Sequence, residues 1–270
     1  MYFAIQTYSM KVFCEHLNAG MAICENNPGS VEMGSFLRLR GLYCLMRGEN
    51  EEARKWLNRS IRVFEELDTA GSGEYDITIA GAYCYIAETL RLEERFDMAF
   101  VYYNKALSYS GGRGYYPGTA SICTDYGLAL FQSGQLEKAE NQFLRAETLY
   151  ESFYEQSQRP IALAFLAYYD TRRGLYRKAA DRLRLAFSIC GRLGSPWWYG
   201  TALYVSWIIR EYLQENGLFP KEFTGLWPED ELAHCMLCLE NLRRIEPTSE
   251  RSRMEQVCRD LSEKKTRQDS

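Results

Sequence analysis

The sequence contains little histidine, a residue that catalytic and metal sites often use. Only two histidines occur in 270 residues, His16 and His234, and neither lies near the other. The chain therefore offers no evident Ser/His/Asp or Cys/His set for nucleophilic catalysis. His234 does lie close to Cys235 and Cys238, but a structural zinc site needs about four ligands, usually from two separated pairs. No second Cys-x-x-Cys is present, so we predict thiols buried in an apolar helix, no metal, no cofactor and no catalytic residues.

The sequence also lacks long apolar runs and an excess of basic residues. No window approaches the roughly 18 continuous apolar residues of a membrane span, and no basic leader precedes an apolar stretch. The net charge is −4, with 32 basic and 36 acidic residues, so no overall basic field favours nucleic acid. The nine cysteines are scattered over apolar helical faces, which favours reduced thiols in the cytoplasm. We predict a cytoplasmic protein that binds neither a membrane nor, directly, nucleic acid.

What the sequence does contain is one pattern repeated four times. Each copy has a short loop, an alanine, a bulky residue four positions later and a small residue three positions after that. This spacing places three residues on one helical face, with small side chains where a neighbouring helix must approach closely. The sets are Ala53, Leu57 and Ser60; Ala99, Tyr103 and Ala106; Ala139, Phe143 and Ala146; and Ala179, Leu183 and Ala186. An apolar helix precedes each set and carries a small residue twelve positions before the alanine, namely Gly41, Ala87, Gly127 or Ala167.

This pattern resembles the tetratricopeptide repeat, a helix-turn-helix unit that stacks into a solenoid. The resemblance covers about residues 35–213. Successive alanines are 46, 40 and 40 residues apart, against about 34 in the standard repeat, which is similar to the long-repeat form found in bacterial regulatory proteins. The resemblance implies an all-α fold, a right-handed α-solenoid of helix-turn-helix repeats.

We divide the chain into four segments on this basis. Residues 1–27 are interpreted as an N-terminal capping helix or a partial repeat, and residues 28–215 as the solenoid, with four full repeats and the first helix of a fifth. Residues 216–246 are expected to form an irregular cap with a helix from Glu229 to Arg244. Residues 247–270, whose charges alternate in sign, predict a solvated helix that frays into a flexible tail.

In tetratricopeptide stacks the first helix of each repeat lines the concave groove, and the family's contact positions can be counted back from each repeated alanine. The resemblance implies a partner-binding groove formed by Arg38, Leu42, Met46, Glu88, Arg91, Leu128, Phe131, Tyr168, Arg172, Tyr204, Ile208 and Tyr212. Leu45, Cys84, Leu92, Thr124, Gln132, Ala164, Thr171 and Glu211 complete the contact positions. The asparagine that chaperone-tail receptors use to hold a C-terminal carboxylate is absent, because Leu42, Glu88, Leu128 and Tyr168 occupy its positions.

These residues predict an apolar and aromatic floor on which Arg38, Arg91 and Arg172 anchor acidic groups. The alternative left open is that the aromatic side chains pack between repeats instead of facing a partner. The same two interpretations apply to Trp197, Trp198 and Trp207, which either fill the end of the stack or anchor an interface.

We predict a non-catalytic scaffold that binds a protein or peptide in the groove. Apolar side chains of the partner would be buried on Leu128, Phe131, Tyr168 and Tyr204, and the arginines would set its orientation. The alternative is an effector-sensing segment of a larger bacterial transcription regulator, suggested by the truncated appearance of residues 2–26. An upstream coding region would distinguish the two. The identity of the partner, the oligomeric state and the occupation of the groove by the C-terminal tail are left open.

Overall fold

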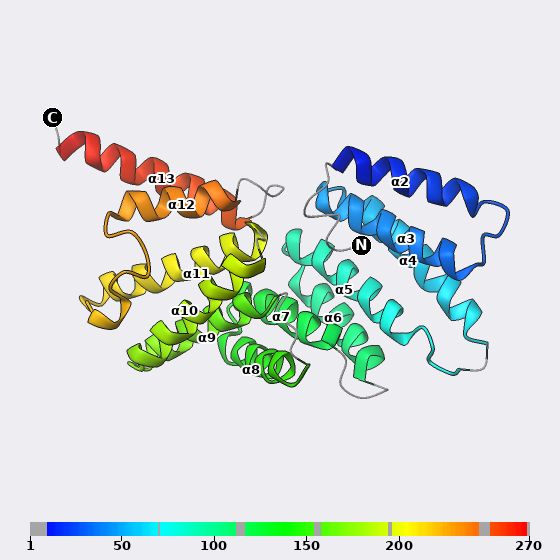
Figure 1. Cartoon of the computed structure of the whole chain (residues 1–270), viewed down its shortest axis with the longest axis horizontal. Helices are drawn as coiled ribbons and strands as arrows, with labels where there is room; N and C mark the ends of the chain where they lie inside the picture. Colours follow the sequence, from blue (N-terminus) through cyan, green and yellow to red (C-terminus); the bar gives the residue numbers. More distant parts are fainter. Residues whose placement is uncertain are drawn as a thin grey trace. The chain divides into compact units, whose positions relative to one another are not determined.

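The computed structural model describes residues 10–69, 71–111, 117–153, 158–193, 196–242 and 249–268, and their regular structure is entirely helical (Figure 1). The chain divides into two compact units, Met1–Gln135 and Leu136–Ser270. Unit 1 contains α2 (Met10–Ile23), α3 (Val31–Met46), α4 (Asn50–Leu67), α5 (Asp76–Leu92), α6 (Phe96–Gly111) and α7 (Pro117–Gln132). Unit 2 contains α8 (Leu136–Phe153), α9 (Arg159–Arg172), α10 (Tyr176–Leu193), α11 (Pro196–Glu215), the short 3₁₀ helix η1 (Lys221–Phe223), α12 (Glu231–Leu242) and α13 (Ser249–Gln268).

The helices pack in the order expected for stacked helix pairs. Within unit 1, α3 packs on α4 and α5 packs on α6, while within unit 2, α9 packs on α10. Each second helix also contacts the next first helix, as α4 does with α5 and α10 does with α11, and successive first helices touch, as α9 does with α11. Neighbour contacts of this kind build a solenoid without a single central core. The predicted all-α fold of helix-turn-helix repeats is confirmed.

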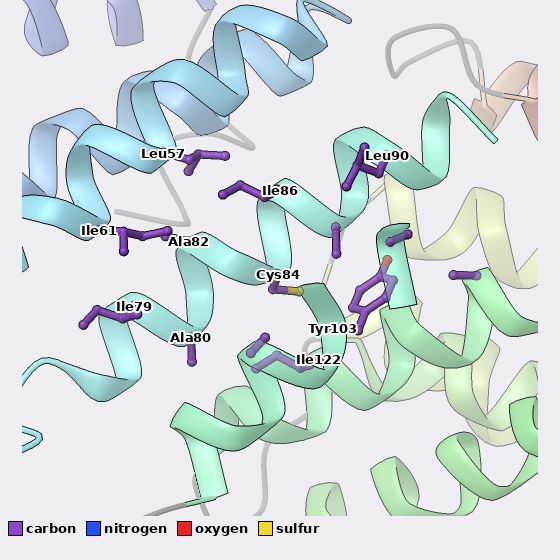
Figure 2. Packing of buried hydrophobic residues seen from close by; sticks show 14 of the residues in the cluster. Leu57, Ile61, Ile79, Ala80, Ala82, Cys84, Ile86, Leu90, Tyr103 and Ile122 are labelled. Carbon is purple, nitrogen blue, oxygen red and sulfur yellow. The ribbon is translucent and has the colours of Figure 1, made fainter. Parts of the chain in front are cut away.

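The repeated sequence pattern marks the buried face of the second helices. All twelve residues of the four sets, from Ala53 to Ala186, are 0% exposed. Small residues are needed on the facing first helix, because a Cβ added at Gly41 would lie 2.5 Å from Cγ of Leu57. In unit 1, Leu57 and Ile61 of α4 face Ile79, Ala82 and Ile86 of α5, so the two repeats share one apolar layer (Figure 2).

The turn inside each repeat has the same backbone geometry. Gly48, Gly134 and Gly174, five residues before the repeated alanine, adopt φ values of 74°, 80° and 74°. The second repeat has Glu94 at the equivalent position, with φ 57°. Its amide still donates to the Arg91 carbonyl, as that of Gly48 does to the Leu45 carbonyl. The fold thus imposes a left-handed conformation even where no glycine is present.

The C-terminal part of unit 2 differs from the sequence prediction in the environment of its last helix. The helix expected from Glu229 to Arg244 is described as α12, Glu231–Leu242. The sequence predicts a solvated helix that frays into a flexible tail over residues 247–270; residues 249–268 do form a helix, α13, but it packs on α12 with Met254 and Cys258 buried. Apolar residues spaced four apart among charged ones give α13 this buried stripe. The division of the chain into four functional segments stays a prediction.

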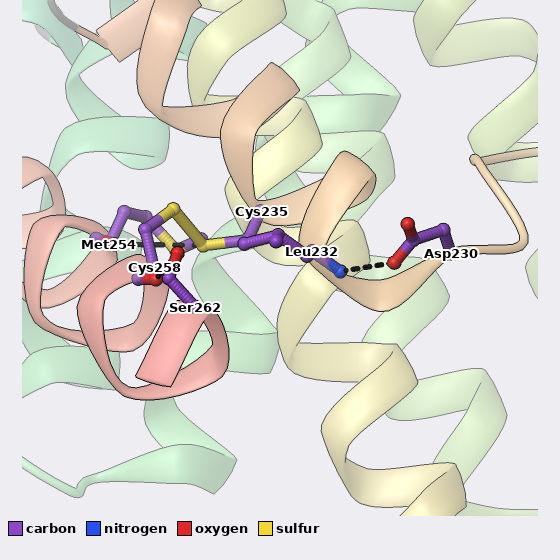
Figure 3. Close-up of a disulfide and its surroundings, with 6 residues drawn as sticks. All are labelled: Asp230, Leu232, Cys235, Met254, Cys258 and Ser262. Carbon is purple, nitrogen blue, oxygen red and sulfur yellow. Dashed lines mark hydrogen bonds between the residues drawn. A yellow bond between two sulfur atoms is a disulfide. The ribbon is translucent and has the colours of Figure 1, made fainter. Parts of the chain in front are cut away.

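The expectation of a fully reduced set of thiols is wrong for one pair. Cys235 of α12 and Cys258 of α13 form a disulfide with their Cα atoms 5.9 Å apart, within the usual range for a bridge (Figure 3). Seven other cysteines are free. Among the described residues, no helix combines the length and the apolar character needed to cross a membrane.

Candidate partner-binding site

The predicted contact positions lie on the first helices of the repeats, and we call them the first-helix face. Unit 1 has such a face on α3, α5 and α7, and unit 2 has its own on α9 and α11. Arg91 is buried and Arg172 is exposed. The other ten predicted residues are all half-buried: Arg38, Leu42, Met46, Glu88, Leu128, Phe131, Tyr168, Tyr204, Ile208 and Tyr212. Half-buried side chains can both support the stack and contact a partner, so the binding role of each remains a prediction.

In unit 1 the charge of Arg91 is already paired with a carboxylate within the fold. Its guanidinium donates to both carboxylate oxygens of Glu88, at 2.9 to 3.2 Å, and to Oε1 of Gln132 at 3.0 Å. Tyr103, on the second helix, donates its hydroxyl to the same Glu88 carboxylate. Arg91 therefore links α5 to α7, and its side chain is only 3% exposed. This arrangement makes Arg91 a structural arginine rather than the acid anchor that was predicted.

Asp125 joins this polar cluster and was not identified from the sequence. Sγ of Cys84 lies 3.6 Å from Oδ2 of Asp125, and this contact links α5 to α7 a second time. Desolvation raises the pKa of Asp125 well above its usual value, and the charge of Glu88 raises it further, while Arg91 opposes the shift. Asp125 directly follows Thr124, an assigned contact position, so extending the assignment by one residue would have found it.

In unit 2 the predicted anchor Arg172 has a different environment. Its guanidinium carbon lies 5.7 Å from the ring centroid of Tyr168 and 5.9 Å from that of Tyr212. Nη1 of Arg172 also lies 3.4 Å from the Tyr168 hydroxyl. Tyr168 is on α9 and Tyr212 is on α11, so two neighbouring first helices hold the arginine. No carboxylate within the described ranges pairs with it.

Arg38 lies on α3 and is half-buried. Its Nε is buried and has no hydrogen-bond acceptor in the described part of the chain. An unpaired buried donor costs free energy unless an acceptor is supplied. Arg38 thus keeps unused donor capacity, in contrast to Arg91.

The His234, Cys235 and Cys238 group is not arranged as a metal site. Nε2 of His234 lies 3.1 Å from Oγ of Ser206, Cys235 is in the disulfide with Cys258, and Cys238 is a buried free thiol. In the part of the chain that the structure describes, no three His, Cys, Asp or Glu side chains gather as metal ligands would.

The tryptophans near α11 have a packing role where they are described. Trp207 is buried in the cluster that joins α11 to α12 and α13, and Trp198 is also buried. Both are therefore part of the packed end of the repeat array rather than exposed interface anchors. The side chain of Trp197 lies outside the described residues.

A second feature of unit 1 lies beside the first-helix face. A hollow of about 630 Å³ opens at the turn between α5 and α6, and Glu94 with its left-handed backbone forms part of its wall. The remaining lining residues are Arg95, Phe96, Asp97, Met98, Phe100, Gln132, Ser133 and Gln135. Of the predicted contact positions, Gln132 alone lines it.

Residues 78–152 match the family model for the tetratricopeptide repeat. The sequence matches no curated protein. In fold, the chain is similar to the apo form of RapI, with a TM-score of 0.61, 13% sequence identity and 96% of each chain covered. It is also similar to PilF of Pseudomonas aeruginosa, with a TM-score of 0.48, 17% identity and coverage of 84% of this chain and 91% of that one.

A further similar structure is YrrB, described as a TPR protein with an unusual peptide-binding site. Its TM-score is 0.46, with 14% identity and coverage of 84% of this chain and 94% of that one. At these identities the likeness shows the fold alone. The resemblance to tetratricopeptide repeats is confirmed, whereas the long-repeat regulatory type stays a prediction.

Proposed function

We propose that the chain is a non-catalytic scaffold that binds a protein or peptide on its first-helix face. The match of residues 78–152 to the tetratricopeptide-repeat model supports this proposal. The alternative, an effector-sensing segment of a larger bacterial transcription regulator, would use the same face. The observation that supports the proposal best is the arrangement of Arg172 between Tyr168 and Tyr212. These three residues all lie in unit 2.

Arg172 has the properties of an anchor for an acidic side chain. Two aromatic rings restrict its guanidinium before any partner arrives, so less side-chain entropy is lost on binding. Stacking on a ring stabilises an exposed cation by about 0.5 to 1 kcal/mol. The charge itself remains accessible, because the residue is exposed. A carboxylate or phosphate approaching in the guanidinium plane could form two parallel hydrogen bonds.

The rings around Arg172 supply the apolar part of the proposed contact. Tyr168, Ile208 and Tyr212 are half-buried and come from α9 and α11, which touch each other. A partner segment that carries an aliphatic side chain near an acidic one would bury the aliphatic side chain on these three residues. The acidic side chain would pair with Arg172. We propose a partner peptide of this composition, and a few such anchors would dominate its affinity.

The test is quantitative mass spectrometry of proteins that co-purify with the chain from source-cell lysate. Wild type is compared with Arg172→Ala, with Tyr168→Ala and with Arg177→Ala, in which an exposed arginine of α10 is removed as a matched control. We expect a species that is recovered with wild type and with the control, and about tenfold less with Arg172→Ala, since charged hydrogen bonds contribute about 1.5 to 3 kcal/mol. A labelled peptide covering the acidic segment of that species should then reproduce the loss in a direct titration.

Equal recovery of every species with all four chains would place the interface elsewhere. Helix content measured by circular dichroism should be unchanged in the variants, because Arg172 is exposed and Tyr168 is half-buried. A loss of helix would attribute reduced recovery to folding instead of to the face.

A further inference from the structure

The C-terminal helix contacts the first-helix face of unit 2. Arg253 of α13 donates Nη2 to Oε2 of Glu211 at 2.6 Å and Nη1 to the Tyr204 hydroxyl at 3.2 Å. Its guanidinium carbon lies 5.8 Å from the centroid of the Tyr204 ring. Tyr204 and Glu211 are two of the four contact positions predicted on α11. A side chain from the chain's own C-terminal helix therefore occupies part of the face proposed for a partner.

The contact has features that select a guanidinium group. A carboxylate accepts one of its N–H groups, a phenol oxygen accepts another, and the face of the same aromatic ring lies against the delocalised cation. Lysine has one compact ammonium and cannot stack as a plane while donating in two fixed directions. Tyr204 and Glu211 together thus form a preformed binding site for an arginine side chain.

The Arg253 side chain can break these contacts while α13 remains packed on α12. The Arg253 side chain is 47% exposed and that of Glu211 is 26% exposed. Exposed ion pairs of this kind contribute about 0 to 1 kcal/mol. The helix itself is held by Met254 and Cys258, which are buried against Leu203 and Trp207, and by the Cys235 to Cys258 disulfide (Figure 3).

We infer that Tyr204 and Glu211 form a subsite for an arginine side chain of a bound peptide, and that Arg253 is its intramolecular competitor. An arginine of the partner displaces Arg253 and takes over its two hydrogen bonds and its place on the ring. That the displacing arginine belongs to a partner rests on the proposed function. The chemistry of the subsite does not depend on Arg172.

The subsite can be tested without knowing the partner, with N-acetyl-arginine amide as the probe and N-acetyl-lysine amide as the matched control. The readout is the ring NMR signal of Tyr204 in the full chain labelled with ¹³C-tyrosine, assigned by its loss in Tyr204→Phe. Three chains are compared: wild type, Arg253→Ala, and Arg253→Ala combined with Glu211→Gln. We expect the arginine compound to shift the Tyr204 signal at about fivefold lower concentration in Arg253→Ala than in wild type, because the competitor contributes up to about 1 kcal/mol.

The lysine compound should have little effect on the Tyr204 signal, and Glu211→Gln should abolish the response to arginine. An absent response in Arg253→Ala, an equal response to the two compounds or a response that survives Glu211→Gln would each overturn the inference. If the inference fails while Arg172→Ala still loses its partner, the proposed function stands and Arg253 is a packing contact. If Tyr204 responds as expected while no partner depends on Arg172, the subsite stands and the proposed acid anchor falls.

Discussion

Glu94 occupies a backbone position that the other repeats fill with glycine. Its φ of 57° lies in the left-handed region, which costs a residue with a Cβ about 1 to 2 kcal/mol. Replacing Glu94 with glycine should stabilise the protein by about 1 kcal/mol, part of the gain being offset by the greater freedom of glycine in the unfolded chain. Urea unfolding followed by circular dichroism measures the change.

The reciprocal control is Gly134→Ala. Apart from its chain neighbours, no atom of the described residues lies within 4 Å of a Cβ built at Gly134, and its φ is 80°. Only backbone conformation opposes the change, so it should destabilise by about 1 kcal/mol. If both variants shift stability in the same direction, the left-handed turn is not the cause.

His234 is held neutral inside unit 2. It is 0% exposed and lies between the rings of Trp207 and Trp227, with centroids 5.4 and 5.6 Å away. Ser206 donates its hydroxyl hydrogen to the Leu203 carbonyl, so its oxygen accepts a hydrogen bond from the Nε2–H of His234. Burial, and secondarily the charge of Arg210, lowers the pKa of His234 to about 3.

This lowered pKa makes stability depend on pH. Below about pH 6.5 the unfolded chain binds a proton on His234, and the folded chain does not do so until about pH 3. The stability contribution is therefore complete above the unfolded value and is lost as the pH falls towards 3, by about 2 kcal/mol between pH 7 and pH 5. Between pH 7 and pH 5, the free energy of unfolding measured with urea should therefore fall by about 2 kcal/mol less in His234→Gln than in wild type. His16→Gln, which changes the exposed histidine of α2, should keep the wild-type dependence, and an unchanged slope in His234→Gln would contradict the assignment.

At the scale of helices, the sequence predicted what local spacing determines. The alanine, bulky and small positions identify the buried face of α4, α6, α8 and α10, because residues three and four apart share one side of a helix. The same spacing could have corrected one contact assignment. Glu88 and Arg91 are three apart on α5 and pair with each other, so the charge of Arg91 is already balanced within the fold.

The role of α13 could not be predicted in this way. Arg253 lies 49 residues from Tyr204 and 42 from Glu211, and Cys258 lies 23 from Cys235. No periodic pattern connects positions so distant and so irregularly spaced. The charges of the segment suggested solvation, yet Met254 and Cys258 are spaced as one helical stripe and are buried. A few apolar residues were sufficient to dock a helix that is otherwise hydrophilic.

Over the whole chain, the balance of acidic and basic residues favours a scaffold that binds protein over one that binds nucleic acid. The chain has 32 basic and 36 acidic residues, and several arginines are paired within the fold, such as Arg159 with Glu147 and Arg182 with Asp170. Binding to DNA without sequence preference depends on unpaired cations that release counterions from the phosphates. We therefore expect duplex DNA to bind no more tightly than the weak end of the non-specific range, a Kd of about 10⁻⁴ M, at physiological salt.

Fluorescence anisotropy of a labelled duplex, titrated at several salt concentrations, measures this directly. Arg172→Ala should leave any residual DNA signal unchanged, while it lowers recovery of the protein partner. A micromolar Kd whose logarithm changes linearly with that of the salt concentration would show that several phosphates are contacted. Loss of that binding in Arg172→Ala would then identify phosphate as the acidic group that the first-helix face of unit 2 recognises, and the scaffold would be a nucleic-acid-binding one.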